Sequence, residues 1–147
     1  AESMPMQSVA LDPTTTVSGQ LAPGDFAALA AHGVRMVVSN RPDNEDPGQL
    51  SAAESARLAA EHGMAFRHVP ILLPALSPAD IDRFAEAMAA ADGPVHAFCR
   101  SGTRSGFVWA IEAARSGRLT PDAVLTAGRN AGADFTPALA WLDRNPA

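Results

Sequence analysis

The sequence predicts an α/β domain in which a short parallel sheet lies between layers of helices. Segments with helical periodicity alternate with short apolar segments, and this alternation is typical of a parallel sheet. A helix-ending glycine followed by an apolar run occurs three times, at Gly33, Gly63 and Gly93. The 147 residues, 47% of them hydrophobic, suffice for one core. We therefore expect residues 1–147 to form a single three-layer domain.

Local residue signals place the individual elements. Apolar composition predicts strands at Val34–Val38, Ala65–Ile71 and Pro94–Phe98, and an earlier strand around Thr16–Gln20. Helices are expected at Pro23–Ala31, from about Thr103–Ser105 to Gly117, and after the capping residues Ser51, Ser77, Thr120 and Thr136.

The composition argues against several classes of function. The net charge is −5 and basic residues do not cluster outside residues 99–105, so we expect no nucleic-acid partner. No apolar run approaches the roughly 20 residues of a membrane span. Ala1–Gln7 lack the basic-then-apolar pattern of a signal peptide, so a cytoplasmic location is expected, although a signal removed before residue 1 is compatible with this sequence. The chain has one cysteine, so we expect no internal disulfide. The four histidines show no metal-ligand spacing with this cysteine, so we expect no metal or cofactor.

Cys99 is the candidate nucleophile because it opens a predicted strand-to-helix turn, Cys99-Arg100-Ser101-Gly102-Thr103-Arg104-Ser105. Successive backbone N–H groups and the start of a helix make such a turn an anion site. An arginine such as Arg104 donates two hydrogen bonds to an oxyanion, and these surroundings favour the thiolate. The alternative is an inert buried cysteine. We expect Cys99 and Arg104 to be catalytic, and the remaining residues of the turn, Arg100, Ser101, Gly102, Thr103 and Ser105, to bind the substrate.

Two further loops are expected beside this turn, because ligands bind at the carboxyl ends of parallel strands. These loops are Ser39–Gln49, which is long and polar, and Leu72–Leu76. Asp43, Glu45 or Asp46 of the first loop could supply an acid, and a solvated turn is the alternative. Arg41, near Asp43, could lock this loop against the site, or form a plain salt bridge.

The turn at Cys99 resembles the active-site loops of protein tyrosine phosphatases and rhodaneses. The wider chain, from about Thr14 to Asn130, resembles the phosphatase-like domain of the beta-lactamase hydrolase-like family. The segments that carry this resemblance are Val17-Ser18-Gly19-Gln20-Leu21, Asn40-Arg41-Pro42-Asp43 and the cysteine loop. It implies a cysteine-phosphatase fold with a four-stranded parallel sheet. In that family the domain is sometimes fused to a sulfur dioxygenase, which here would be a separate partner.

Loop length favours sulfur chemistry over phosphate chemistry. Four residues separate Cys99 from Arg104, as in rhodanese-type loops, whereas tyrosine phosphatases have one residue more. A phosphatase also needs an acid to protonate the leaving oxygen. Related phosphatases place it after the preceding strand, where this chain has Leu72–Leu76, and Asp80 is better explained as a helix cap.

We therefore expect a sulfurtransferase, in which Cys99 takes sulfur from thiosulfate or a persulfide and passes it to an acceptor thiol. The alternative is a phosphatase acting on a phosphate ester through a Cys99 phosphocysteine. A non-catalytic anion-binding module is the third interpretation. His96, on the strand before Cys99, is expected to be a hydrogen-bonded histidine of the sheet.

Overall fold

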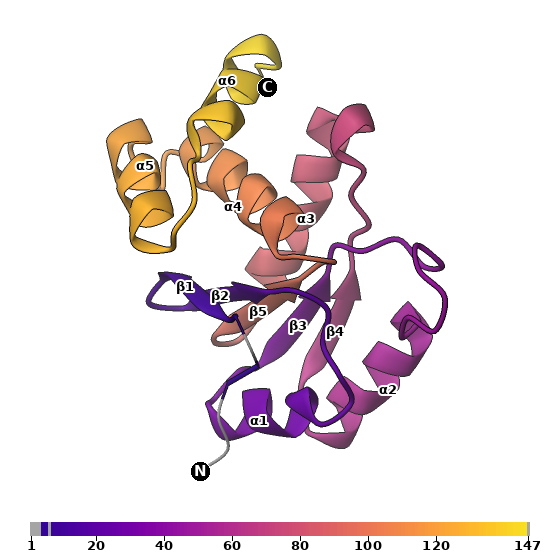
Figure 1. The fold of residues 1–147 in the computed structure, drawn as a ribbon. Helices are drawn as coiled ribbons and strands as arrows, with labels where there is room; N and C mark the ends of the chain where they lie inside the picture. The colour runs from indigo at the N-terminus through magenta and orange to yellow at the C-terminus, as the bar shows by residue number, and fades with distance from the viewer. Residues whose placement is uncertain (1–3, 6, 147) are drawn as a thin grey trace.

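The computed structural model describes residues 4–5 and 7–146, and confirms the α/β fold class (Figure 1). The strands are β1 (Val9–Asp12), β2 (Thr15–Ser18), β3 (Met36–Ser39), β4 (Ala65–His68) and β5 (Val95–Phe98). The helices are α1 (Asp25–Ala31), α2 (Ala52–Glu61), a short 3₁₀ helix η1 (Leu73–Ala75), α3 (Pro78–Ala90), α4 (Thr103–Arg115), α5 (Pro121–Asn130) and α6 (Thr136–Arg144).

The sheet has five strands in the order β1-β2-β5-β3-β4. The four expected strands are the parallel ones, and β5 lies in the middle between β2 and β3. β1 was not expected from the sequence. It pairs antiparallel with β2 through a turn in which Asp12 Oδ1 accepts the backbone N–H of Thr14 at 2.8 Å. The central position of β5 places Cys99, the next residue, at the middle of the carboxyl edge.

Helices cover both faces of the sheet, and the strands alternate between the two apolar layers (Figure 1). On one face, Val37 and Phe98 pack with residues from α1 and α2, including Phe26 and Ala59. On the other face the strands contribute Met36, Val38, Val95 and Ala97 to a larger cluster with α3, α4, α5 and α6. Trp109 and Trp141 both belong to this second cluster.

The capping signals position the helices as expected, with one exception. Ser51 and Ser77 form complete capping boxes with Glu54 and Asp80, and Thr120 caps α5. Thr136 does not cap α6: it is the first helical residue, and its N–H donates to Asp134 Oδ1 at 2.9 Å.

The expected role of glycine as a left-handed helix end is confirmed twice and wrong once. Gly33 and Gly63 have φ of 88° and 75° after α1 and α2. Gly93 does not take up this conformation, and α3 ends earlier, at Ala90. A Cβ at Gly93 would lie 2.4 Å from Arg35 Cγ, so glycine here makes room for the side chain of Arg35. Within the described part of the chain, no helix is long and apolar enough to cross a membrane.

Candidate active site

The cysteine loop connects the end of β5 to the start of α4 and is held by the backbone that follows β2. The N–H of Cys99 donates to Ser18 O at 3.3 Å, and the N–H of Gln20 donates to Arg100 O at 3.3 Å. A Cβ at Gly19 would lie 3.0 Å from that same Arg100 oxygen. Glycine at position 19 therefore lets the two backbone segments approach closely.

The sulfur of Cys99 is enclosed by its own loop. Cys99 is 1% exposed, and its Sγ accepts the backbone N–H of Gly102 at 3.0 Å. Gly102 has φ of 92°, and a Cβ there would lie 3.3 Å from the carbonyl carbon of Ser18. The left-handed residue turns this N–H toward the sulfur, where it stabilises a thiolate.

Arg104 contacts the loop that follows β3, as expected, and Ile71, the residue just before the expected third segment Leu72–Leu76. Its Nη1 and Nη2 donate to the two carboxylate oxygens of Glu45, each at 2.7 Å, and Nη1 also donates to Ile71 O at 3.1 Å. The hydrogen bond to Glu45 raises the pKa of Arg104, and the nearby Cys99 sulfur raises it further.

Glu45 is held as a carboxylate between two arginines. Besides Arg104, the Nε of Arg41 donates to it at 2.9 Å. The hydrogen bond from Arg104 lowers the pKa of Glu45 to about 2, and Arg41 acts in the same direction. A carboxyl group with this pKa is ionised at neutral pH, so it has no proton to give to a leaving group in this arrangement.

Arg41 ties the loop after β3 to the site, and its side chain is only 4% exposed. Its guanidinium also donates to Gln20 Oε1 at 2.8 Å and pairs with Asp46. The interpretation of Arg41 as a lock on this loop is therefore supported, with Glu45 and Asp46 as its carboxylate partners.

Asp43 binds the start of the next helix. Its Oδ1 accepts the N–H of Ala52, at the first turn of α2, at 2.8 Å. This contact gives Asp43 a helix-capping function, and its accessory function in catalysis stays a prediction. Glu45 and Asp46 are the acids of this loop that reach the site.

The remaining residues of the cysteine loop lie in two different environments. Arg100 is 68% exposed, and its Nε contacts Asp46 Oδ2 at 3.1 Å. Ser101 Oγ donates to Thr103 Oγ1 at 3.1 Å on the surface. Ser105, which we expected to bind substrate, is fully buried and donates to Asn40 Oδ1 at 2.7 Å. Ser105 therefore joins the cysteine loop to the end of β3 inside the protein.

Sequence reasoning did not anticipate Gln20, Asn40 or the Ile71 carbonyl as partners of the site. Each directly follows the end of a strand or lies within three residues of it, on the same edge of the sheet. The sequence alone does not identify these groups as part of the site, because the strand order decides which loops are neighbours.

His96 is a hydrogen-bonded histidine of the sheet, as expected. Its Nδ1 lies 2.7 Å from Thr16 Oγ1 and its Nε2 lies 2.8 Å from Ser18 Oγ. Because Ser18 Oγ donates its proton to Gly19 O, it accepts from His96 Nε2–H, and Nδ1 accepts from Thr16. Burial lowers the pKa of His96 to about 4, so the ring is neutral at pH 7.

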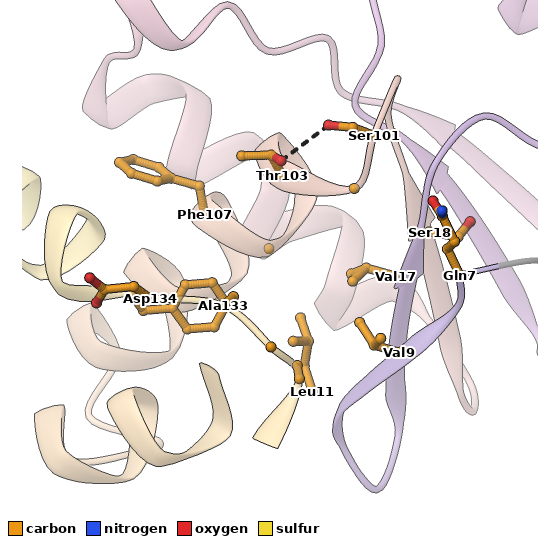
Figure 2. Close-up of a pocket in the computed structure, with 15 residues that line it drawn as sticks. Gln7, Val9, Leu11, Val17, Ser18, Ser101, Thr103, Phe107, Ala133 and Asp134 are labelled. Carbon is orange, nitrogen blue, oxygen red and sulfur yellow. Dashed lines mark hydrogen bonds between the residues drawn. The ribbon is translucent and has the colours of Figure 1, made fainter. Parts of the chain in front are cut away.

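A cavity of about 380 Å³ lies beside the cysteine loop, between β1, β2, the start of α4 and the α5–α6 connection. Figure 2 shows the hydroxyl groups of Ser101 and Thr103 at one end of this cavity and the apolar side chains of Val9, Leu11 and Val17 on one side. Cys99 and Arg104 do not line it. Among the described residues, no group of three or more histidine, cysteine, aspartate or glutamate side chains is placed to hold a metal ion.

The comparison with protein families finds a match to the phosphatase-like domain of the beta-lactamase hydrolase-like protein, over residues 8–116. A relative with that name, the beta-lactamase hydrolase-like protein of Agrobacterium fabrum, is 34% identical over 142 residues. The match covers 97% of this chain but 33% of the relative, so the chain spans about a third of that protein's length.

Solved structures with the same fold include cysteine-based phosphatases. A candidate phosphatase from Neisseria meningitidis is 28% identical, with a TM-score of 0.81 over 95% of this chain and 98% of its own. Tk-PTP in its active form has a TM-score of 0.70 over 96% of both chains, at 22% identity. The likeness to Tk-PTP concerns the fold alone.

Proposed function

Because the chain belongs to the phosphatase-like domain family of beta-lactamase hydrolase-like proteins, we propose that it is a cysteine-dependent phosphatase with Cys99 as nucleophile. One observation carries the proposal: the sulfur of Cys99 accepts the Gly102 N–H at 3.0 Å and lies beside the guanidinium of Arg104. A thiolate, a backbone donor and an arginine together form the machinery for attack on a bound oxyanion.

The reaction has two steps. The Cys99 thiolate attacks phosphorus, the ester P–O bond breaks, and the leaving oxygen departs with the electron pair. Water then attacks the phosphocysteine, the P–S bond breaks, and inorganic phosphate and the thiolate are released. Arg104 and the loop amides bind the equatorial oxygens in both steps.

The ionised state of Glu45 restricts the leaving group. With a pKa of about 2, Glu45 does not protonate the departing oxygen, and Asp43 is bound to Ala52 N. We therefore expect the enzyme to favour esters whose leaving oxygen is weakly basic, such as aryl phosphates, over alkyl phosphates.

Sulfur transfer is the second candidate, favoured by the four-residue spacing between Cys99 and Arg104 and by the same ionised Glu45. In this reaction the Cys99 thiolate attacks the outer sulfur of thiosulfate, the S–S bond breaks, and sulfite leaves. An acceptor thiolate, or cyanide, then takes the outer sulfur and restores the Cys99 thiolate. Sulfite and thiolates leave without protonation, so no acid is needed. A sulfur dioxygenase would then be the enzyme that uses the persulfide product.

A paired assay of wild type and Cys99→Ser tests both candidates. Hydrolysis of an aryl phosphate is measured beside sulfur transfer from thiosulfate to cyanide. Hydrolysis that is lost in Cys99→Ser supports the phosphatase, and sulfur transfer alone overturns it in favour of the second candidate. Binding of phosphate or thiosulfate without either turnover identifies an anion-binding module, and retention of turnover by Cys99→Ser removes Cys99 as nucleophile. Ser116→Ala, at the opposite end of α4 from the cysteine loop, is the control for a single exchange outside the site.

A further inference from the structure

The guanidinium of Arg104 has two edges, and the structure uses them differently. Five N–H groups are available. Glu45 accepts one from Nη1 and one from Nη2, and Ile71 O accepts the second from Nη1. The two that remain, Nε–H and the second N–H of Nη2, lie along one edge. Their parallel direction suits two oxygens of a tetrahedral anion.

From this division we infer that Glu45 is a positioning residue, which holds the far edge of Arg104 so that its Nε–Nη2 edge is presented to the anion at Cys99. The inference rests on the proposed function and adds a residue to it. Glu45 contacts neither the sulfur nor a leaving group in this function. It acts through Arg104, whose pKa responds to both Glu45 and Cys99.

The support of Glu45 is itself rigid. Arg41 is nearly fully buried and binds Glu45, Asp46 and Gln20, so three partners from two loops fix its guanidinium. Arg41, Glu45 and Arg104 are joined by a continuous chain of charge-assisted hydrogen bonds. Arg41 Nε donates to Glu45 at 2.9 Å, and Arg104 donates to Glu45 twice, at 2.7 Å each. An arginine has several rotatable bonds, and this chain removes that freedom before the substrate arrives.

A competing interpretation is that Glu45 shields Arg104 and must leave before an anion binds. The contacts favour positioning, because Glu45 and Ile71 O occupy Nη1 and one N–H of Nη2, so the Nε–Nη2 edge stays clear of the carboxylate. The cluster also stays positive toward an anion, because two carboxylates, Glu45 and Asp46, pair with three arginines, Arg41, Arg100 and Arg104. The two interpretations predict opposite signs for the effect of removing the carboxylate.

A double-mutant cycle separates these interpretations. Glu45→Gln is made in the wild type and in Arg104→Lys, because an ammonium group is a point charge without an edge to orient. With an aryl phosphate, Glu45→Gln should lower kcat roughly tenfold to a hundredfold and change KM by less than about threefold, since phosphate still binds by charge. In the Arg104→Lys background the same substitution should change kcat by less than about twofold. Glu61→Gln, which breaks the exposed Arg57–Glu61 pair of 2.7 Å, is the matched control and should leave kcat unchanged.

Three outcomes overturn the inference. A higher kcat and tighter phosphate binding in Glu45→Gln would identify Glu45 as a shield. An equal loss of kcat in both backgrounds would identify general support of the loop, and an unchanged kcat would show that Glu45 has no role in catalysis. If Glu45→Gln does not fold, Glu45→Asp replaces it. Its shorter side chain reaches fewer of the three donors, and the same cycle applies.

The cycle also works if the proposed function fails. When wild type turns over neither substrate, the four proteins are titrated with orthovanadate, whose oxygens can take up the geometry of phosphoryl transfer, and with inorganic phosphate. Positioning predicts that Glu45→Gln weakens orthovanadate binding more than phosphate binding, and only where Arg104 is present. Equal weakening for both anions, or in both backgrounds, overturns it.

Discussion

The backbone N–H of Gly102 points at the sulfur of Cys99 from a distance of 3.0 Å, and it does so because Gly102 has φ of 92°. The contact spans three residues and joins the start of the cysteine loop to the start of α4. The Cys99 thiolate is therefore stabilised only while the peptide group of Gly102 keeps this orientation.

Gly102→Ala should separate this contact from ordinary backbone strain. The new Cβ would lie 3.3 Å from the Ser18 carbonyl carbon and would disfavour positive φ, so the N–H should turn away from Cys99. We expect kcat to fall by roughly a hundredfold, as for loss of one oxyanion donor. Gly33→Ala is the control, since Gly33 has φ of 88° and no atom within 4 Å of the Cβ position. Both variants should lose roughly 1–2 kcal/mol of stability, but only Gly102→Ala should lose activity. Equal activity in the two variants contradicts this role of Gly102.

Asp43 should matter for stability and not for catalysis. Asp43→Ala removes the acceptor of the Ala52 N–H, which should cost about 1 kcal/mol in the free energy of unfolding. Asp43→Asn keeps an oxygen acceptor and should restore most of that loss. Urea unfolding and kcat/KM are measured for both variants. If Asp43 were the acid that protonates the leaving group, both variants would lose activity, including the stable Asp43→Asn.

Arg100 should strengthen substrate binding when it leaves its ion pair with Asp46 and contacts the anion. The pair is exposed and separated by 3.1 Å, so it is weak, and an incoming anion competes with Asp46 for Arg100. Arg100→Ala should raise KM by roughly threefold, and Arg100→Lys, which keeps the charge, should raise KM by less. Both effects should shrink at about 0.5 M salt, because exposed charges are screened. A change in kcat of the same size, or effects independent of salt, would argue against a role in binding alone.

The features of this fold that the sequence predicts well are local. A capping box needs Ser51 and Glu54 three residues apart, and a left-handed helix end needs Gly33, so neighbours in sequence decide both. β1 was missed because four residues carry little pattern and its existence depends on pairing with β2. The role of Gly93 was predicted wrongly because the requirement for glycine there comes from the side chain of Arg35, a residue distant in sequence.

The candidate site shows the same division. Cys99, Gly102 and Arg104 belong to one continuous motif and were found in the sequence. The sequence did not decide which acid faces Arg104, because Asp43, Glu45 and Asp46 are almost adjacent. Their partners depend on Arg41, which is held by Gln20 from a loop distant in sequence.

His96 should make the stability of the fold depend on pH in a defined range. Its folded pKa of about 4 lies below the ordinary value of 6.5, because the buried ring accepts a proton only against the cost of desolvation. Between pH 6.5 and 4 the unfolded chain therefore binds more protons at this residue, and stability falls as the pH falls. The contribution is fully present above pH 6.5 and is lost as the pH approaches 4, by on the order of 2–3 kcal/mol.

His96→Gln should be less stable at pH 7, because Thr16 and Ser18 lose their partner, but its free energy of unfolding should depend less on pH in this range. Urea unfolding at intervals from pH 7.5 to 4 gives the two slopes, and the other histidines and the carboxylates cancel in the difference. Glu45 does not confuse the result, since its pKa of about 2 places the loss of its contribution mostly below pH 4.5. Equal slopes for wild type and His96→Gln would show that His96 is protonated as easily in the folded protein as in the unfolded chain.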